Sequence, residues 1–376
     1  MKIIIAPDKF KGSLSTFEVC HAIRDGIHQA DDSAELLLFP MADGGDGFAA
    51  VMKFYLHTNT VECQTVDPLR KNITASYQWN SETKTAIIEM AVASGLVLLK
   101  DEERNPLKTS TYGTGLLVSD AIQRGAQRIM LGLGGSATND AGMGTLSALG
   151  FVFKDSDDKF LEASGENLSR IEKIIVPPEI PKAKFEIACD VQNLLYGANG
   201  AAYVYAAQKG AGDDAIKLLD DGLRHFAEIV NRQTGRDVST VPGTGAAGGI
   251  AAGLMAFFDV ELKKGIDLVI ESSAIKNKIG AADLLITGEG RIDEQTLQGK
   301  AVSELSLLAS MNGIPVVAFC GTSTASARMV EDIGVQYLEC LVSASTTVQQ
   351  AMVHAKDLLV LRAKEFFRDH FLNKSH

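Results

Sequence analysis

Four short segments of the sequence combine glycine with charged or hydroxyl-bearing residues, each at or near the end of a predicted strand. They are residues 6–13 (APDKFKGS), 41–47 (MADGGDG), 134–140 (GGSATND) and 287–293 (TGEGRID). In open α/β sheets, ligands bind at the carboxyl ends of the strands, so these segments are the natural place for chemistry. Glycine there lets backbone N–H groups approach phosphate oxygens and permits positive φ. The pattern predicts a site for a small anion.

The first and fourth segments carry charges of both signs. Asp8 and Lys11 precede a predicted helix N-terminus, whose positive end suits an anion. Arg291 could hold a carboxylate or phosphate through two N–H groups, and the flanking Glu289 and Asp293 could hold Mg²⁺. The alternatives are a capped turn and a solvated, salt-bridged loop. Burying the three charges of the fourth segment without a ligand would be costly, which favours a binding site there.

The second and third segments are richer in small residues. Asp43 and Asp46 lie among three glycines and could hold Mg²⁺, or the segment could be a tight turn capped by Asp46. The third segment has small residues and two hydroxyls before a predicted helix, which is typical of an anion nest. Capping of that helix by Asn139 or Asp140 is the alternative. The residues expected to contact phosphate are Gly134, Gly135, Ser136, Ala137, Thr138 and Asn139.

Three further candidates are weaker. Asp190 ends a predicted strand, and Lys209 lies in a glycine-rich turn. Residues 243–248 match the dinucleotide-binding pattern G-x-G-x-x-G, but no clear strand precedes them, so we expect Gly248 to face a phosphate or a substrate carboxylate instead. An NAD-dependent oxidoreductase remains the alternative. All seven histidines lie outside the four segments, so a general base should be an aspartate. Together these groups suit phosphoryl transfer.

The elements that position these segments change character along the chain. Both ends alternate strands and helices, as in a parallel sheet. Near the N-terminus, Glu18 stands three residues after Ser15, the spacing of a capping box. The expected strands of the ends are 2–6, 35–39, 282–286, 314–319 and 335–338, and the expected helices are 13/15–29, 48–56, 300–311, 324–331 and 346–367.

The middle of the chain begins with three strands joined by short polar turns, which predicts an antiparallel meander. We therefore expect an α/β protein of two domains. Residues 1–62 and 281–376 would form a discontinuous Rossmann-like domain with a parallel sheet. Residues 63–280 would form an inserted mixed α/β domain, with the active site in the cleft between the two. The expected strands of the middle are 60–66, 72–79, 85–90, 128–133 and 185–188. The expected helices are 113–124, one that follows residue 140 and ends at about 149, 213–233 and 248–258.

Composition narrows the class of protein. The 36 Lys and Arg against 47 Asp and Glu give a net charge of −11, which argues against nucleic acid or an anionic membrane as a partner. Five cysteines without a C-x-x-C pair indicate a reducing compartment rather than disulfides or zinc. The first apolar run is too short for a signal peptide, so we expect a cytoplasmic monomer or homodimer that acts on small molecules.

Taken together, eight motifs resemble those of the type-I (bacterial) glycerate kinases, in order from Met1 to about Gly321. Such enzymes are two-domain α/β proteins that phosphorylate D-glycerate with ATP and Mg²⁺, generally giving 2-phosphoglycerate; formation of 3-phosphoglycerate remains an alternative. Lys9 departs from the family, which commonly has serine there. The motifs are APDKFKGSLS, PMADGGDG, RNPLKTSTYGTG, LGGSATNDAGMG, CDVQN, QKGAG, GTGAAGGIAAGL and ITGEGRIDEQT.

The resemblance implies roles for the residues that fall in these motifs. We expect Arg291 or a lysine to hold the glycerate carboxylate, with Asp8 and Gly248 also at the substrate. Asp190 is the expected base, with Asp43 or Asp8 as alternatives, and Lys11 and Asp43 would assist catalysis. Residues 134–139 with Lys209 would hold the ATP phosphates, and Glu289 and Asp293 would lie near Mg²⁺.

Overall fold

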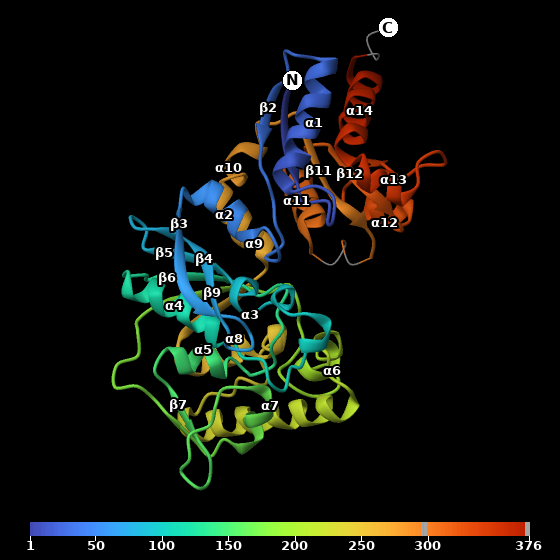
Figure 1. The fold of residues 1–376 in the computed structure, drawn as a ribbon. Helices are drawn as coiled ribbons and strands as arrows, with labels where there is room; N and C mark the ends of the chain where they lie inside the picture. Colours follow the sequence, from blue (N-terminus) through green and yellow to red (C-terminus); the bar gives the residue numbers. More distant parts are fainter. Residues whose placement is uncertain (295, 297–298, 373–376) are drawn as a thin grey trace. The chain divides into compact units, whose positions relative to one another are not determined.

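A computed structural model of the chain describes residues 1–294, 296 and 299–372. By its internal contacts the chain divides into two compact units. Unit 1 comprises Met1–Asp43 and Ile266–His376, and unit 2 comprises Gly44–Gly265. Unit 1 is therefore built from both ends of the chain, coloured blue and orange to red in Figure 1, and unit 2 is an uninterrupted insertion.

Within the described residues, unit 1 has a five-stranded sheet in the order β13-β12-β11-β1-β2, and every neighbouring pair is parallel. The expected parallel sheet from both termini is confirmed. Helices connect β1 to β2, β11 to β12 and β12 to β13, as a parallel arrangement requires. The strands are β1 (Lys2–Pro7), β2 (Glu35–Leu38), β11 (Leu284–Ile292), β12 (Val316–Ser323) and β13 (Tyr337–Cys340).

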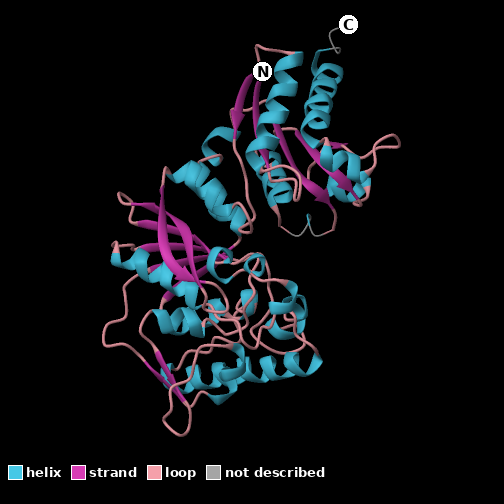
Figure 2. Ribbon diagram, in the orientation of Figure 1, coloured by secondary structure: helices cyan, strands magenta, loops and turns pink. Residues whose placement is uncertain are grey.

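Helices cover both faces of the unit 1 sheet, visible as cyan coils around the magenta arrows in Figure 2. Side chains of α1 and α14 share a core with one face of β1, β11 and β12, and α11 packs on the same three strands. Ile3, Ile4 and Ile5 are all fully buried, which explains the unbroken apolar run of β1. The helices are α1 (Thr16–Ala30), α9 (Gly265–Ser273), α10 (Lys276–Ile279), α11 (Ala301–Ser310), α12 (Ala327–Asp332), α13 (Val348–Val353), α14 (Ala355–Phe367) and η7 (Arg368–Leu372).

Unit 2 is organised around a mixed sheet in the order β10-β9-β6-β5-β4-β3. The pairs from β10 to β5 are parallel, whereas β5, β4 and β3 form the expected antiparallel meander. A separate antiparallel pair, β7 with β8, was not expected from the sequence. The strands are β3 (Asn59–Val66), β4 (Asn72–Asn80), β5 (Thr85–Glu89), β6 (Arg128–Gly132), β7 (Val152–Lys154), β8 (Lys173–Ile175), β9 (Lys184–Ala188) and β10 (Asp259–Lys263).

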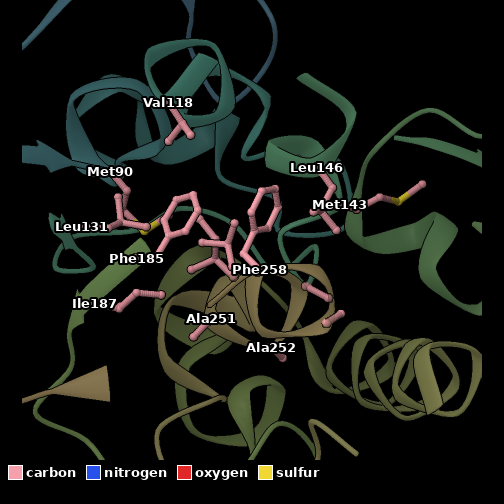
Figure 3. Packing of buried hydrophobic residues seen from close by; sticks show 14 of the residues in the cluster. Met90, Val118, Leu131, Met143, Leu146, Phe185, Ile187, Ala251, Ala252 and Phe258 are labelled. Atoms are coloured by element: carbon pink, nitrogen blue, oxygen red, sulfur yellow. The ribbon is translucent and has the colours of Figure 1, made fainter. Parts of the chain in front are cut away.

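The core of unit 2 joins strands β6 and β9 to α4, α5 and α8, and Figure 3 shows part of it. Phe185 and Phe258 meet edge to face there, with ring centroids 5.1 Å apart. The α-helices are α2 (Phe48–Leu56), α3 (Ala91–Ser94), α4 (Tyr112–Gln123), α5 (Met143–Ala148), α6 (Ala201–Tyr205), α7 (Asp213–Thr234) and α8 (Ile250–Phe257). The 3₁₀ turns are η1 (Leu96–Leu98), η2 (Asp101–Glu103), η3 (Gly165–Arg170), η4 (Ala207–Lys209) and η5 (Ala246–Gly248).

Two stretches fall on the other side of the division from the one expected. Residues 44–62 belong to unit 2, because the buried face of α2 packs on β4 and β5 and because β3 pairs with β4. Residues 266–280 belong to unit 1, where α10 packs on α11. The helix expected over 346–367 is broken at His354. In the described part of the chain, no helix is both long and apolar enough to span a membrane.

Candidate active site

Unit 1 contains a cavity of about 300 Å³. The charged residues that line it come from the segment after β1, from the segment after β2, and from β11 and the residues that follow it. The first, second and fourth candidate segments therefore contribute to one cavity. The charged residues are Asp8, Lys9, Lys11, Asp43, Glu289, Arg291, Asp293 and Lys300.

Backbone and hydroxyl contacts hold these segments together. The Asp8 N–H donates to the Gly288 carbonyl at 2.8 Å, which joins the first segment to the fourth. The buried Thr16 hydroxyl donates to the Pro7 carbonyl at 2.9 Å and accepts from the Met41 N–H at 3.1 Å. That hydroxyl thereby ties the first segment to the second. The positions of these segments are thus set by the fold of unit 1 itself.

The fourth segment is a strand and not the loop that the sequence predicted. β11 continues to Ile292, with Glu289 opposite Cys320 and Arg291 opposite Thr322 of β12. A Cβ on Gly288 would lie 2.1 Å from the Phe319 carbonyl oxygen, so glycine permits close strand pairing there. Glu289 and Arg291 lie two positions apart on the strand and therefore share one face of the sheet.

Asp8 is the most perturbed carboxyl of the cavity. Its side chain is 8% exposed, and burial raises its pKa to about 7. Lys9 opposes this shift, with its Nζ 3.9 Å from Asp8 Oδ1, whereas Asp43 and Glu289 add to it. Lys9 Nζ also lies 3.5 Å from Asp43 Oδ1. The acids of the cavity therefore disfavour one another's ionised forms, and a bound cation would relieve this repulsion.

Glu289 and Asp293, the two predicted Mg²⁺ ligands, both line the cavity. Burial raises the pKa of Glu289, whose carboxylate accepts the Thr296 hydroxyl proton, and Asp293 Oδ2 lies 3.3 Å from Arg291 Nε. Among the described residues, no three His, Cys, Asp or Glu side chains gather closely enough to hold a metal together. Kinase Mg²⁺ sites need only one or two carboxylates, because substrate phosphates and water complete the shell. Glu289 and Asp293 fit this kind of Mg²⁺ site.

The third segment lies in unit 2 and is anchored from both sides. The Ala137 N–H donates to the Ser94 carbonyl at 2.9 Å, and the Thr109 hydroxyl donates to the Ala137 carbonyl at 2.8 Å. A Cβ on Gly134 would lie 2.8 Å from Gly45 Cα, so this glycine serves close packing. The small residues of this segment thus have structural reasons of their own besides any contact with phosphate.

Asp140 and Asn139 are adjacent and both buried, but they differ in their hydrogen bonding. Asp140 is fully buried and accepts hydrogen bonds from the Thr111 N–H and hydroxyl and from the Gly142 and Gly144 N–H groups. It therefore caps the α5 end of the segment, and burial raises its pKa. Asn139 is also fully buried, yet its amide oxygen and nitrogen have no hydrogen-bond partner in the described structure. The Thr138 hydroxyl shares this condition.

Lys209 joins the third segment from η4. Its side chain is 1% exposed, and its Nζ donates to the Thr138 carbonyl at 2.7 Å. Burial lowers the pKa of Lys209 to about 7, and the Asp140 charge only partly opposes this shift. We call Thr138, Asn139, Asp140 and Lys209 the unit 2 cluster. Buried polar atoms without partners are rare in folded proteins, and a ligand or an ordered water at this position would satisfy them.

Gly248 packs directly on the unit 2 cluster. With φ at +73°, its missing Cβ would lie 2.2 Å from the Thr138 carbonyl oxygen and 2.5 Å from Asn139 Cα. Its neighbour Ala247 also has positive φ, at +51°, as does Ala141 on the facing segment. Packing thus explains Gly248 without a substrate contact. Residues 243–248 follow a turn and no strand precedes them, so the dinucleotide-binding context is missing.

Asp190, the expected base, lies two residues after the end of β9 in unit 2. It is exposed, and its Oδ1 accepts the Gly265 N–H at 3.0 Å. Two charged groups were not singled out from the sequence. Lys300 lines the unit 1 cavity. The buried Arg104 Nε has no hydrogen-bond partner among the residues that the structure describes, and a Cβ on the neighbouring Gly210 would lie 2.2 Å from the Arg104 carbonyl oxygen. Arg104 is the first residue of the motif RNPLKTSTYGTG, whereas no motif in the sequence points to Lys300.

Comparison with known proteins gives a consistent result. The model of the "Glycerate kinase family" matches residues 3–370. A glycerate kinase of Halalkalibacterium halodurans is 40% identical over 376 residues, covering 99% of both chains. Glycerate 2-kinase of Escherichia coli K12 is 38% identical, covering 95% of this chain and 94% of its own. A similar crystal structure is that of a Salmonella typhimurium LT2 protein described as a glycerate kinase 2. The match covers 100% of both chains, with 34% identity and a TM-score of 0.89.

Proposed function

The chain belongs to the glycerate kinase family, and from this premise we propose that it transfers the γ-phosphoryl group of ATP to the 2-hydroxyl of D-glycerate. The products are ADP and 2-phosphoglycerate. The observation that carries the proposal is the unit 1 cavity, which places four cationic and four acidic side chains around one space. A cavity of this composition can hold an anionic substrate and a metal-bound phosphate together.

In the proposed reaction, Arg291 holds the glycerate carboxylate, and Lys9, Lys11 and Lys300 contact phosphate oxygens. Arg291 is suited to this role because its planar guanidinium matches a carboxylate with two parallel N–H groups. Glu289 and Asp293 would hold Mg²⁺, which when bound neutralises charge on the phosphate oxygens. Asp8 and Asp43 remain close enough to influence the electrostatics of this site, since Asp43 raises the pKa of Asp8.

From unit 2, the third segment and Lys209 are proposed to hold phosphate oxygens. The unpartnered Asn139 amide and Thr138 hydroxyl support this role, because a phosphate oxygen would satisfy the donors that they present. Burial lowers the pKa of Lys209 to about 7 without a ligand, and a phosphate beside the ammonium group would favour its charged form. Since the proposed residues are divided between the two units, the proposal keeps the expectation that the reaction needs both.

Asp190 is proposed to take the proton of the reacting hydroxyl. Its carboxylate is exposed just beyond the carboxyl end of the parallel strand β9, and one of its oxygens accepts the Gly265 N–H.

Release of ADP tests the proposal. Purified protein with ATP, Mg²⁺ and D-glycerate should produce ADP in a coupled assay, and L-glycerate should be a poor substitute. Two simpler acids separate the hydroxyls, because D-lactate keeps only the 2-hydroxyl and 3-hydroxypropionate keeps only the 3-hydroxyl. We expect slow turnover of D-lactate and none of 3-hydroxypropionate. The absence of ADP formation that depends on D-glycerate would contradict the proposed function.

A further inference from the structure

The unit 1 cavity has a second, apolar half that the charged residues do not explain. Its walls come from the loop after β1, from the chain after β13, and from one face of α13. None of these residues was singled out from the sequence. The apolar residues are Phe10, Leu341, Val342, Val348, Ala351 and Met352, with Ala355 at the start of α14.

The apolar half is built by α13 and held in place by unit 1. A capping box of Thr347 and Gln350 fixes the start of α13, and Val348, Ala351 and Met352 then fall at i, i+3 and i+4 on one helix face. At the other end, the Ser13 hydroxyl donates to the Met352 carbonyl at 2.9 Å. The first candidate segment and the apolar wall are thereby joined directly.

Parts of this wall are exposed in a way that calls for a partner. Val348 is 53% exposed and Met352 is 46% exposed, although both line the cavity beside buried Ala351. Exposed apolar side chains that line a concave surface next to charged groups are typical of a small-molecule site. The volume of about 300 Å³ is at the lower end of the range for such sites.

The two reactants differ in what they can offer an apolar wall. Glycerate is a three-carbon acid with two hydroxyls, so each of its carbons carries a polar group. ATP has a flat, largely apolar base at one end and charged phosphates at the other. Apolar surface gains free energy only by covering apolar surface, so the base is the part of either reactant that suits this wall. The neighbouring charged half suits the phosphates and their metal.

We infer that the apolar half of the unit 1 cavity, formed by α13, Phe10 and the chain after β13, binds the base of ATP. This inference rests on the proposed function, since it assigns one substrate of that reaction to a place. It makes α13 a determinant of nucleotide affinity that does not touch glycerate. The triphosphate would leave the base site past Lys9, Lys11 and Lys300 of the same cavity.

Filling the base site tests the inference. Ala351→Trp should raise the KM for ATP by about tenfold or more, which corresponds to about 1.4 kcal/mol of lost binding, and should leave the KM for D-glycerate unchanged. The matched control is Val353→Trp, because Val353 lies on the same short helix, is 71% exposed and is not among the residues that line the cavity. The control should keep both KM values.

A second set of measurements does not depend on accommodating a large side chain. Val348→Ser and Met352→Ser change exposed positions, and calorimetric titration with ADP should show a several-fold weaker Kd for each. Adenosine, which has no phosphate, should inhibit the wild-type enzyme competitively against ATP. A rise in the KM for D-glycerate alone, or unchanged ADP binding in both serine variants, would overturn the inference while the wild type still formed ADP. Failure of the wild type to form ADP would instead reject the proposed function.

Discussion

The unit 1 cavity and the unit 2 cluster bring polar groups together in opposite ways. The cavity holds charges of both signs, several of them half-exposed, such as Arg291 and Asp43. The cluster is closed to water, and its Asn139 amide and Thr138 hydroxyl have no partners. Charges at an open cavity cost the fold little, whereas unpartnered buried groups destabilise it by about 1–3 kcal/mol each. Substitutions of the exposed charges of the cavity should therefore affect activity alone, and substitutions in the cluster should affect activity and stability in opposite directions.

The largest expected effect is on kcat, and it shows whether the general base comes from unit 1 or from unit 2. Asp190→Asn should lower kcat by about 10²- to 10⁴-fold with little change in either KM, because the amide cannot take the hydroxyl proton. The matched control is Asp259→Asn, an exposed aspartate of β10. If Asp8→Asn caused this loss and Asp190→Asn did not, the base would belong to the unit 1 cavity.

The second prediction concerns pH and Lys209. Burial lowers the pKa of Lys209 to about 7 in the folded chain, against about 10.4 for an unfolded lysine. Between these values the unfolded chain binds more protons, so this residue makes stability rise from pH 7 to pH 10. Its full penalty is present below pH 7. Lys209→Met should thus raise the free energy of unfolding most at pH 6, by as much as about 4 kcal/mol, and the gain should shrink toward pH 10.

Calorimetry of wild type and variant across that pH range measures this difference, because all other titrating groups are shared. Lys159→Met, at a position whose side chain is 71% exposed, is the control and should show no difference that varies with pH. Activity should fall in Lys209→Met at every pH. A gain in stability that grew with pH would contradict the burial of a neutral lysine.

The third prediction uses two asparagines of unit 2. Asn139→Leu keeps the side-chain shape and removes unpartnered polar atoms, so Tm should stay equal or rise while kcat/KM falls by about 10- to 100-fold. Asn193 is the matched control, because it donates to the Asn199 carbonyl at 2.7 Å and accepts from the Tyr205 hydroxyl at 2.6 Å. Asn193→Leu should lower Tm. A clear loss of stability in Asn139→Leu would show that its amide has a structural role.

The smallest effect on stability is expected in the cavity. Arg291→Gln breaks an ion pair with Asp293 in which the arginine is 62% exposed, so the free energy of unfolding should change by less than about 0.5 kcal/mol. The KM for D-glycerate should nevertheless rise by about tenfold, because the carboxylate loses its guanidinium partner. Arg328→Gln changes a 90% exposed arginine of α12 and should leave both quantities unchanged. Equal KM values for Arg291→Gln and Arg328→Gln would remove Arg291 from the proposed site.

The same two regions show what the sequence could reveal. Strands such as β1 and the capping box of Ser15 and Glu18 were predicted correctly, because their signals are local. Asp8, Asp43, Glu289, Arg291 and Asp293 were recognised by charge beside glycine, and they line one cavity. The strand character of residues 287–292 was missed, because the need for Gly288 comes from the Phe319 carbonyl of a neighbouring strand.

The rest depends on contacts between distant residues. Lys209 lies in a polar, glycine-rich turn, and nothing near it in the sequence shows that its side chain is buried against Thr138. The lack of partners for Asn139 is likewise invisible before the fold is known. Gly248 was expected at the substrate, but its glycine is already required by packing on Thr138 and Asn139. The apolar wall of α13 was missed because a six-residue helix is too short for a clear periodic signal.

Phosphorus NMR of the reaction product tests the central claim most directly. With ATP, Mg²⁺ and D-glycerate, the account predicts ADP and a new monoester resonance split into a doublet, because phosphorus on the 2-oxygen couples to the single proton of that carbon. A triplet would place the phosphate on the 3-oxygen, whose carbon carries two protons, and would contradict transfer to the 2-hydroxyl. An ATP spectrum that does not change with D-glycerate would contradict glycerate phosphorylation altogether.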